Sequence, residues 1–278
     1  MTVAVLSDST AAIPPDIAAE YGITVVPIWL TVGGRAYQDG TLDQEELIAR
    51  FDEGISTSGP SAGEFEDAIS SVLADDGAVL LTVSGDFSAT VRAARVAAGA
   101  FDGKVRVVDT KMVAAAQALV VMAAAAAAKA GCTLDEVEAA ADRAIGEARL
   151  VATLDTLDYL VKSGRIPGVA GWVGKRAGLR PLVEFSGGKI HPLRPAFSRD
   201  AALTRVIARW KKSQDGDGRL HVAALHSMDE ESARRLLDEV RSRVEPETAF
   251  LSEFGPAMVA YTGPGVVGLA WRWERDGT

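Results

Sequence analysis

The chain has 278 residues, enough for one large domain or two ordinary ones, and 48% of them are hydrophobic, so a sizeable core can be buried. Its 29 basic and 38 acidic residues give a net charge of −9, which argues against nucleic acid or anionic lipid as a partner, because both need a basic surface. The single cysteine, Cys132, and an N-terminus without the basic region of a secretory signal lead us to expect a cytoplasmic protein.

Strand and helix patterns alternate over the first half of the chain. Apolar runs at residues 2–6, 24–32, 78–83 and 105–108 predict strands, and helical patterns follow at 14–21, 43–52, 61–73, 89–98 and 133–149. Ser61 with Glu64, and Thr133 with Glu136, have the spacing of capping boxes at helix starts. Strands without alternation, followed by helices, indicate a parallel sheet covered on both faces. We therefore predict a doubly wound α/β domain over residues 1–150.

One alanine-rich run, residues 112–128, needs a test for membrane insertion. Its only polar residue is Gln117, but it falls short of the ~20 apolar residues that span a bilayer. Thr110 and Gly131 stand where an N-cap and a C-terminal left-handed glycine would stand. We predict a buried helix here rather than a membrane span.

The pattern changes after Leu150. We expect strands at residues 181–185, 189–193 and 220–225, separated by helices at 201–212 and 230–240. Gly187-Gly188 between two β-rich runs predicts a hairpin and hence antiparallel pairing. Two final strands, 257–261 and 266–273, are expected around a glycine turn. Residues 151–278 are therefore predicted to form an α+β domain with a mainly antiparallel sheet.

Hydroxyl residues gather where two helices of the first half are expected to start. Thr57 and Ser58 come just before the helix that Ser61 caps, and Ser88 and Thr90 follow the strand at 78–83. Helix N-termini attract anions, and ligands of open parallel sheets bind at the carboxyl ends of the strands. Two such sites facing each other would hold a carboxylate or a phosphate. The alternative is that these hydroxyls are ordinary caps and turn formers.

Motifs for nucleotide binding, serine hydrolysis and zinc are missing from the sequence. No G-x-G-x-x-G follows a strand, no Walker lysine occurs, and the residues around Ser88 form no G-x-S-x-G elbow. One cysteine and three dispersed histidines offer no zinc spacing. Asp8, Asp39 and Asp109 could hold magnesium, although turn formation explains them equally well. We expect no catalytic residue, metal or cofactor.

Taken together, several short motifs resemble the DegV family over nearly the whole chain. Their order and spacing are more specific than any one of them. They are Ser7-Asp8-Ser9-Thr10, Tyr37-Gln38-Asp39-Gly40, Thr57-Ser58-Gly59-Pro60-Ser61, Ser88-Ala89-Thr90, Thr156-Leu157-Asp158-Tyr159-Leu160 with Gly164-Arg165-Ile166, and Gly263-Pro264-Gly265 with Gly268.

The resemblance implies a carrier that binds a long-chain fatty acid between two domains and presents it to a separate fatty acid kinase, with room for a transient membrane contact. The residues implied around the carboxylate are Thr57, Ser58, Ser88 and Arg165. Three positions depart from the family pattern: Tyr261 stands where a histidine is common, Ala89 where glycine is usual, and Phe197 near where a basic loop residue is common. The alternative hypothesis is that the protein is an enzyme, a phosphotransferase or hydrolase, that uses Asp8 or Ser88.

Overall fold

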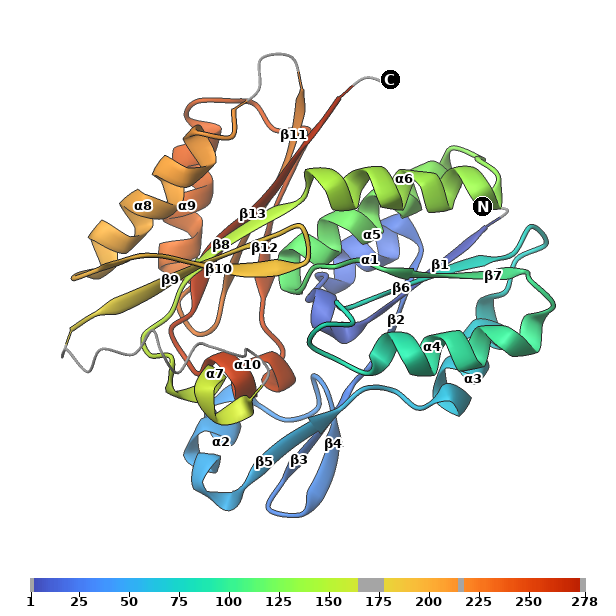
Figure 1. Ribbon diagram of the computed structural model, residues 1–278, viewed down its shortest axis with the longest axis horizontal. Coiled ribbons are helices and arrows are strands. Elements are labelled where there is room, and N and C mark those ends of the chain that lie inside the picture. Colours follow the sequence, from blue (N-terminus) through green and yellow to red (C-terminus); the bar gives the residue numbers. More distant parts are fainter. Residues whose placement is uncertain (1–2, 165–177, 215–217, 276–278) are drawn as a thin grey trace.

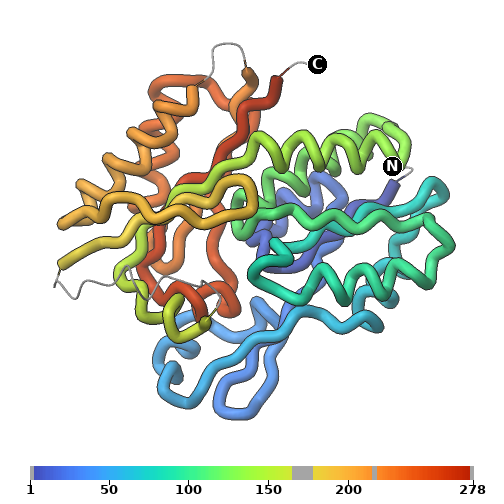
Figure 2. Tube along the Cα trace, in the orientation of Figure 1, coloured from blue at the N-terminus to red at the C-terminus, as the bar shows by residue number. Residues whose placement is uncertain are grey.

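Three β-sheets organise the protein. The computed structural model describes residues 3–164, 178–214 and 218–275. A four-stranded and a six-stranded sheet lie side by side, and a small three-stranded sheet lies below them in the view of Figure 1. The trace in Figure 2 runs from blue to green through the four-stranded and three-stranded sheets, and then crosses to the six-stranded sheet, where it stays to the end.

The four-stranded sheet has the order β2-β1-β6-β7, and all of its neighbouring strands are parallel. Its strands are β1 (Ala4–Asp8), β2 (Ile23–Val26), β6 (Ala78–Thr82) and β7 (Val105–Asp109). One face packs against α3 (Ala62–Val72) and α4 (Thr90–Ala98), and the other against α1 (Pro15–Tyr21), α5 (Ala114–Lys129) and α6 (Leu134–Glu147). The predicted doubly wound parallel sheet is therefore confirmed.

The six-stranded sheet has the order β10-β9-β8-β13-β11-β12, and every pair except β11-β12 is antiparallel. Its strands are β8 (Arg149–Thr153), β9 (Arg180–Ser186), β10 (Lys189–Ala196), β11 (Arg219–His226), β12 (Thr248–Glu253) and β13 (Val267–Glu274). Alternate residues point to opposite faces. Val151 and Val222 therefore pack toward α8 (Arg199–Lys211) and α9 (Glu230–Arg241), while Leu150 and Leu225 face α5. The mainly antiparallel second half is confirmed.

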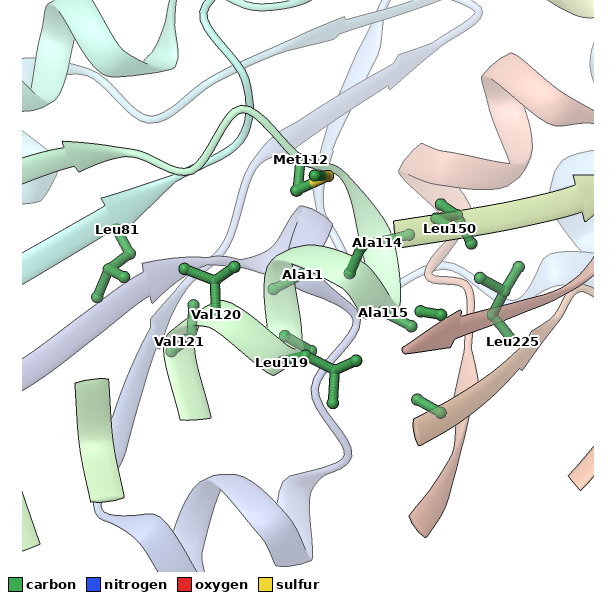
Figure 3. Packing of buried hydrophobic residues seen from close by; sticks show 14 of the residues in the cluster. Ala11, Leu81, Met112, Ala114, Ala115, Leu119, Val120, Val121, Leu150 and Leu225 are labelled. Atoms are coloured by element: carbon green, nitrogen blue, oxygen red, sulfur yellow. The ribbon is translucent and has the colours of Figure 1, made fainter. Parts of the chain in front are cut away.

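Helix α5 is the wall that both large sheets share. It contacts β1 and β6 on one side and β8, β11 and β13 on the other, and thirteen of its 16 residues are buried. Alanine side chains are short enough to let a helix lie close to two sheets at once. Figure 3 shows Ala114 and Ala115 toward Leu150 and Leu225 of the six-stranded sheet, and Val120 and Val121 of the same helix toward the parallel sheet. The buried helix is thus confirmed. Within the described ranges, no helix is long and apolar enough to cross a membrane.

The cap expected for α5 was wrong. The helix starts after Val113, which makes no side-chain cap, whereas the Thr110 hydroxyl donates to the carbonyl of Thr82, 2.8 Å away. Gly131 does have the predicted left-handed conformation, with φ 84°. The capping boxes at Ser61 and Thr133 both form.

The strand expected at residues 257–261 was also wrong, because these residues form helix α10 (Pro256–Thr262). Pro256 suits the first turn of a helix, which lacks hydrogen-bonded N–H groups. The β-rich run at 24–32 divides at Pro27 between β2 and β3 (Trp29–Val32), which belong to different sheets. The small sheet has the order β4-β3-β5, with β4 (Arg35–Gln38) and β5 (Ile55–Ser58) on either side of β3, and α2 (Gln44–Ala49) lies between β4 and β5 in sequence.

The domain boundary expected at residue 150 stays a prediction. The new sheet begins nearby, with β8. However, one buried hydrophobic cluster contains Val5 of the parallel sheet, Leu119 of α5 and Leu225 of the six-stranded sheet. The two large sheets therefore share a core.

Candidate functional site

An internal cavity opens at the carboxyl ends of β1 and β6. The chain leaves β1 through α1 and adds β2 on one side, whereas β6 pairs with β1 on the other side. Ligands of open α/β sheets bind at such a switch in strand order. Thr10, just after β1, and Val83, just after β6, both line the cavity. The fold thus places a ligand site where the parallel sheet faces the six-stranded sheet.

The walls of the cavity differ in chemistry. The parallel-sheet side and the end of β5 contribute hydroxyl groups as well as apolar side chains, whereas the strands of the six-stranded sheet contribute apolar side chains alone. The hydroxyl residues there are Thr10, Thr57, Ser58, Ser88 and Thr90; the apolar residues include Leu150, Ala152, Val183, Phe185, Ile190 and Leu225. Over the part of the chain that the structure describes, no lining residue has a charged side chain. The cavity therefore suits a long apolar group with one small polar end.

The loop after β5 packs closely against the start of α4. A Cβ atom added to Gly59 would overlap the side chain of Thr90 and lie 3.4 Å from its Cα, so the β5–α3 loop rests directly on the first turn of α4. The Ser88 and Thr90 hydroxyls are 2.7 Å apart, and the backbone N–H of Thr90 donates to Ser88 Oγ at 3.2 Å. Thr57 and Ser58 end strand β5, so they approach α4 from that strand.

The structure brings most of the expected site residues together. Thr57, Ser58, Ser88 and Tyr261 all line the cavity, although Thr57 and Ser58 belong to a strand rather than to a helix N-terminus. Ala89 is the N-cap of α4, is exposed and does not line the cavity; its φ of −76° is open to any residue, so glycine is not required there. The remaining expected residue, Arg165, lies outside the described residues.

Asp8 is buried at the end of β1 and is enclosed by hydrogen-bond donors. Its Oδ2 accepts the Val83 N–H at 2.8 Å, and its Oδ1 accepts the Thr10 hydroxyl, the Thr10 N–H at 3.1 Å and the Gln117 amide at 3.3 Å. Burial raises the pKa of Asp8, and these hydrogen bonds oppose that rise. Because Thr10 and Val83 both line the cavity, the carboxyl group joins two parts of its wall.

Asp39 holds the start of helix α10, which forms part of the opposite wall. Its Oδ2 accepts the Ser9 hydroxyl at 2.7 Å, and its Oδ1 accepts the Ala257 N–H at 3.0 Å, in the first turn of α10. Burial raises the pKa of Asp39, and both hydrogen bonds oppose that rise. Helix α10 carries Met258 and Tyr261 into the cavity wall. The capping of α10 by a residue more than 200 positions away could not be seen in the sequence, although the Tyr37-Gln38-Asp39-Gly40 motif pointed to Asp39.

An aromatic pair bridges the two halves of the cavity. Phe87, in the loop before α4, meets Phe185 of β9 edge to face, with ring centroids 6.1 Å apart and an angle of 78° between the ring planes. Both rings line the cavity and both are partly exposed. Sequence reasoning expected an apolar tunnel for the tail but did not identify this pair or the residues of the apolar wall, because neither belongs to a local motif.

The aspartates considered for magnesium do not form a metal site together. Asp8 and Asp39 accept the hydrogen bonds given above, and Asp109 accepts from Gly85 N–H at 3.2 Å and from Lys111 Nζ at 2.7 Å. Among the described residues, no group of three or more histidine, cysteine or acidic side chains could hold a metal ion.

The chain is similar to the proteins of one family along its whole length. A family model described as an uncharacterised protein of the DegV family matches residues 2–274. A DegV domain-containing protein of Streptomyces coelicolor is 34% identical over 274 residues, which cover 96% of this chain and 97% of the relative.

Solved structures of similar proteins carry the same fold. A DegV family protein from Thermus thermophilus, described by its fatty acid binding, has a TM-score of 0.91 at 28% identity, covering 98% of this chain and 100% of its own. A DegV lipid binding protein from Thermotoga maritima has a TM-score of 0.87 at 26% identity, covering 99% of this chain and 100% of its own.

Proposed function

Because the chain belongs to the DegV family, as the match over residues 2–274 shows, we propose that it binds one long-chain fatty acid in the cavity between its two large sheets. The carboxylate lies at the hydroxyl groups of Thr57, Ser58 and Ser88, with Tyr261 nearby, and the tail runs along the apolar face of the six-stranded sheet. The observation that carries this proposal is the division of one cavity into a hydroxyl-rich end and an apolar wall.

The apolar wall supplies most of the binding free energy. Each buried methylene is worth ~0.8 kcal/mol, so a dozen of them contribute about 10 kcal/mol before the ordering costs of binding. The hydroxyl groups compensate the carboxylate for part of its lost hydration and fix its position. Arg165 is proposed as a further partner of the carboxylate, on the strength of its Gly-Arg-Ile motif alone.

We propose a carrier rather than a catalyst, one that works in the cytoplasm and hands its fatty acid to a separate kinase. The rival enzyme hypothesis used Asp8 or Ser88. Asp8 is fully enclosed by its own hydrogen bonds, so it has no path to a substrate. Ser88 is paired with Thr90, and no basic side chain lines the cavity within the described residues to activate it as a nucleophile.

The test begins with protein purified from a bacterial host. We expect lipid extraction and mass spectrometry to recover a long-chain fatty acid at about one per chain, and delipidated protein to bind palmitate again. Ser88→Ala removes a hydroxyl that donates a hydrogen bond to the charged carboxylate of the ligand, so it should weaken palmitate binding by about 10- to 100-fold. Ser71→Ala is a matched control, because Ser71 is exposed on α3 and bonds only to the local Ala68 carbonyl.

Recovery of no lipid, together with no binding of added fatty acid, would end the proposal. An equal loss of palmitate affinity in Ser88→Ala and Ser71→Ala would mean that the protein binds the fatty acid but that the carboxylate does not lie at the hydroxyl groups. Turnover of acyl esters or phosphorylated substrates by the chain alone, lost in Ser88→Ala, would favour the enzyme hypothesis instead.

A further inference from the structure

A second groove lies along the C-terminal half of α5 and shares no lining residue with the fatty-acid cavity. One side of it is apolar and is formed by α5 residues such as Leu119, Met122 and Ala126, with Tyr21 beside them. The other side is formed by α6 and by the ends of β11 and β13. The two sites thus lie at opposite ends of the same buried helix.

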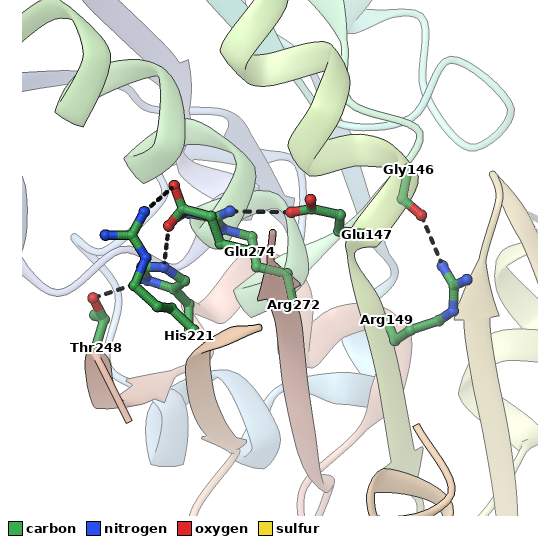
Figure 4. Close-up of polar contacts among 8 residues, drawn as sticks. Gly146, Glu147, Arg149, His221, Thr248, Arg272 and Glu274 are labelled. Atoms are coloured by element: carbon green, nitrogen blue, oxygen red, sulfur yellow. Dashed lines mark hydrogen bonds and ion pairs between the residues drawn. The ribbon is translucent and has the colours of Figure 1, made fainter. Parts of the chain in front are cut away.

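The floor of this groove is a row of polar side chains across three neighbouring strands. Arg272 of β13 is opposite His221 of β11, and His221 is in register with Thr248 of β12, so all three share one face of the sheet. Figure 4 shows this row with Glu274 and Glu147 beside it. Along the rest of this face the strands present residues such as Ala223, Leu225 and Ala270 to the core. Burying polar groups is unfavourable unless they are paired.

The groups of this row are connected, but not all of their donors are used. Arg272 is 6% exposed and donates to Glu147 at 3.1 Å and to Glu274 at 3.4 Å, while His221 lies 2.7 Å from Glu274. The Nε–H of Arg272 is buried and has no hydrogen-bond partner among the described residues. Burial, assisted by the charge of Arg272, lowers the pKa of His221, so the imidazole is neutral near pH 7.

The groove has an excess of positive charge. Its described lining residues include four arginines (Arg143, Arg219, Arg272, Arg275) and two glutamates (Glu147, Glu274), so 4 − 2 leaves a formal charge of +2, in a chain whose net charge is −9. Arg143 and Glu147 lie on one face of α6, with Ala140 one turn earlier. Arg143 and Arg275 are exposed and can reach a ligand in the groove.

We propose that this groove binds a small organic phosphate monoester that has an apolar group. A phosphate monoester carries a charge of about −1.5 to −2 near pH 7, which balances the excess positive charge of the groove. Guanidinium groups pair with phosphate oxygens through two parallel hydrogen bonds. The apolar part of the ligand packs on the opposite side of the groove, where Ala126 and Ala130 are exposed and Ala127 is half-buried. Inorganic phosphate cannot make this contact.

Phenyl phosphate, inorganic phosphate and phenol are suitable probes, since they separate the charged part of the ligand from the apolar part. Calorimetric titrations are made on the full chain saturated with palmitate, so that the fatty-acid cavity is closed to them. We expect saturable binding of one phenyl phosphate per chain, at least about tenfold tighter than inorganic phosphate or phenol. Arg143→Gln and Arg275→Gln should each weaken it by about tenfold, because each removes a charged hydrogen-bond donor. Arg95→Gln, an exposed arginine on α4, is the matched control and should change nothing.

No saturable binding of phenyl phosphate would overturn the proposal. If inorganic phosphate bound as tightly as phenyl phosphate, the groove would not recognise an apolar group. If phenol bound as tightly, the groove would not recognise the phosphate. Unchanged binding in both Arg143→Gln and Arg275→Gln would place the ligand elsewhere. If the chain does not bind palmitate, the same titrations are made on the chain alone, and the failure of palmitate binding bears only on the proposed carrier function.

Discussion

Replacing Ala152 by leucine should shorten the fatty acid that the protein prefers. Ala152 is 5% exposed, lies on β8 and lines the cavity. It pairs with Val183 of β9 on one side and with Gly268 of β13 on the other. Gly268 has no side chain, and a Cβ added there would come within 2.9 Å of the Ala152 Cβ. The missing side chain leaves room for leucine to extend into the cavity without displacing the neighbouring strand.

The magnitude follows from the tail volume that leucine takes. Leucine adds roughly three methylene equivalents, so an acid that fills the cavity loses the burial of about three methylenes, or about 2.4 kcal/mol. That loss corresponds to about 50-fold in Kd. An acid shorter by three methylenes should bind the variant and the parent equally well.

The assay is displacement of a fluorescent fatty acid by saturated acids of about 10 to 18 carbons, with the Tm of each variant as the check on folding. Ser88→Ala is the contrasting variant, because it acts at the carboxylate and should lower affinity by one factor at every chain length. If Ala152→Leu also reduced affinity equally at all lengths, or left the preferred length unchanged, the tail would not lie on this wall.

Three further outcomes follow from the same contacts. Asp39→Ala removes the acceptor of the Ala257 N–H in the first turn of α10, so the free energy of unfolding in urea should fall by about 1–2 kcal/mol. An unchanged free energy would mean that this hydrogen bond does not stabilise the protein. Asp8 has a folded-state pKa raised by burial above its ordinary 3.8, so its contribution to stability is full below that pH and is lost as the pH rises through the folded pKa. The free energy of unfolding of the parent minus that of Asp8→Asn should therefore fall from acid toward neutral pH, and a rise would reverse the assigned direction. Gly59→Ala brings a methyl group against Thr90, so we expect weaker palmitate binding and a loss of about 1–3 kcal/mol in stability, and unchanged binding would mean that this contact does not position the site.

Local sequence signals determined most of the helices and the parallel sheet. The capping boxes at Ser61 and Thr133 formed as predicted because their partners are three residues apart and form in any context that starts a helix. The apolar strands at the N-terminus and at residues 78–83 paired in parallel, and helices cover both faces of their sheet. The residues that the family motifs pointed to include Thr57, Ser58, Ser88 and Tyr261, and these four line one cavity.

Only the tertiary structure decided what surrounds those residues. Residues 257–261 were predicted as a strand, yet they form a helix because Pro256 begins it and Asp39, far away in sequence, accepts a hydrogen bond from its first turn. The contact of Gly59 with Thr90 and the polar row of Arg272, His221 and Thr248 depend on chain segments that meet only after folding. Periodicity and capping act over a few residues, whereas a cavity wall is set by the register and packing of distant strands, and for this reason its shape is absent from any local pattern.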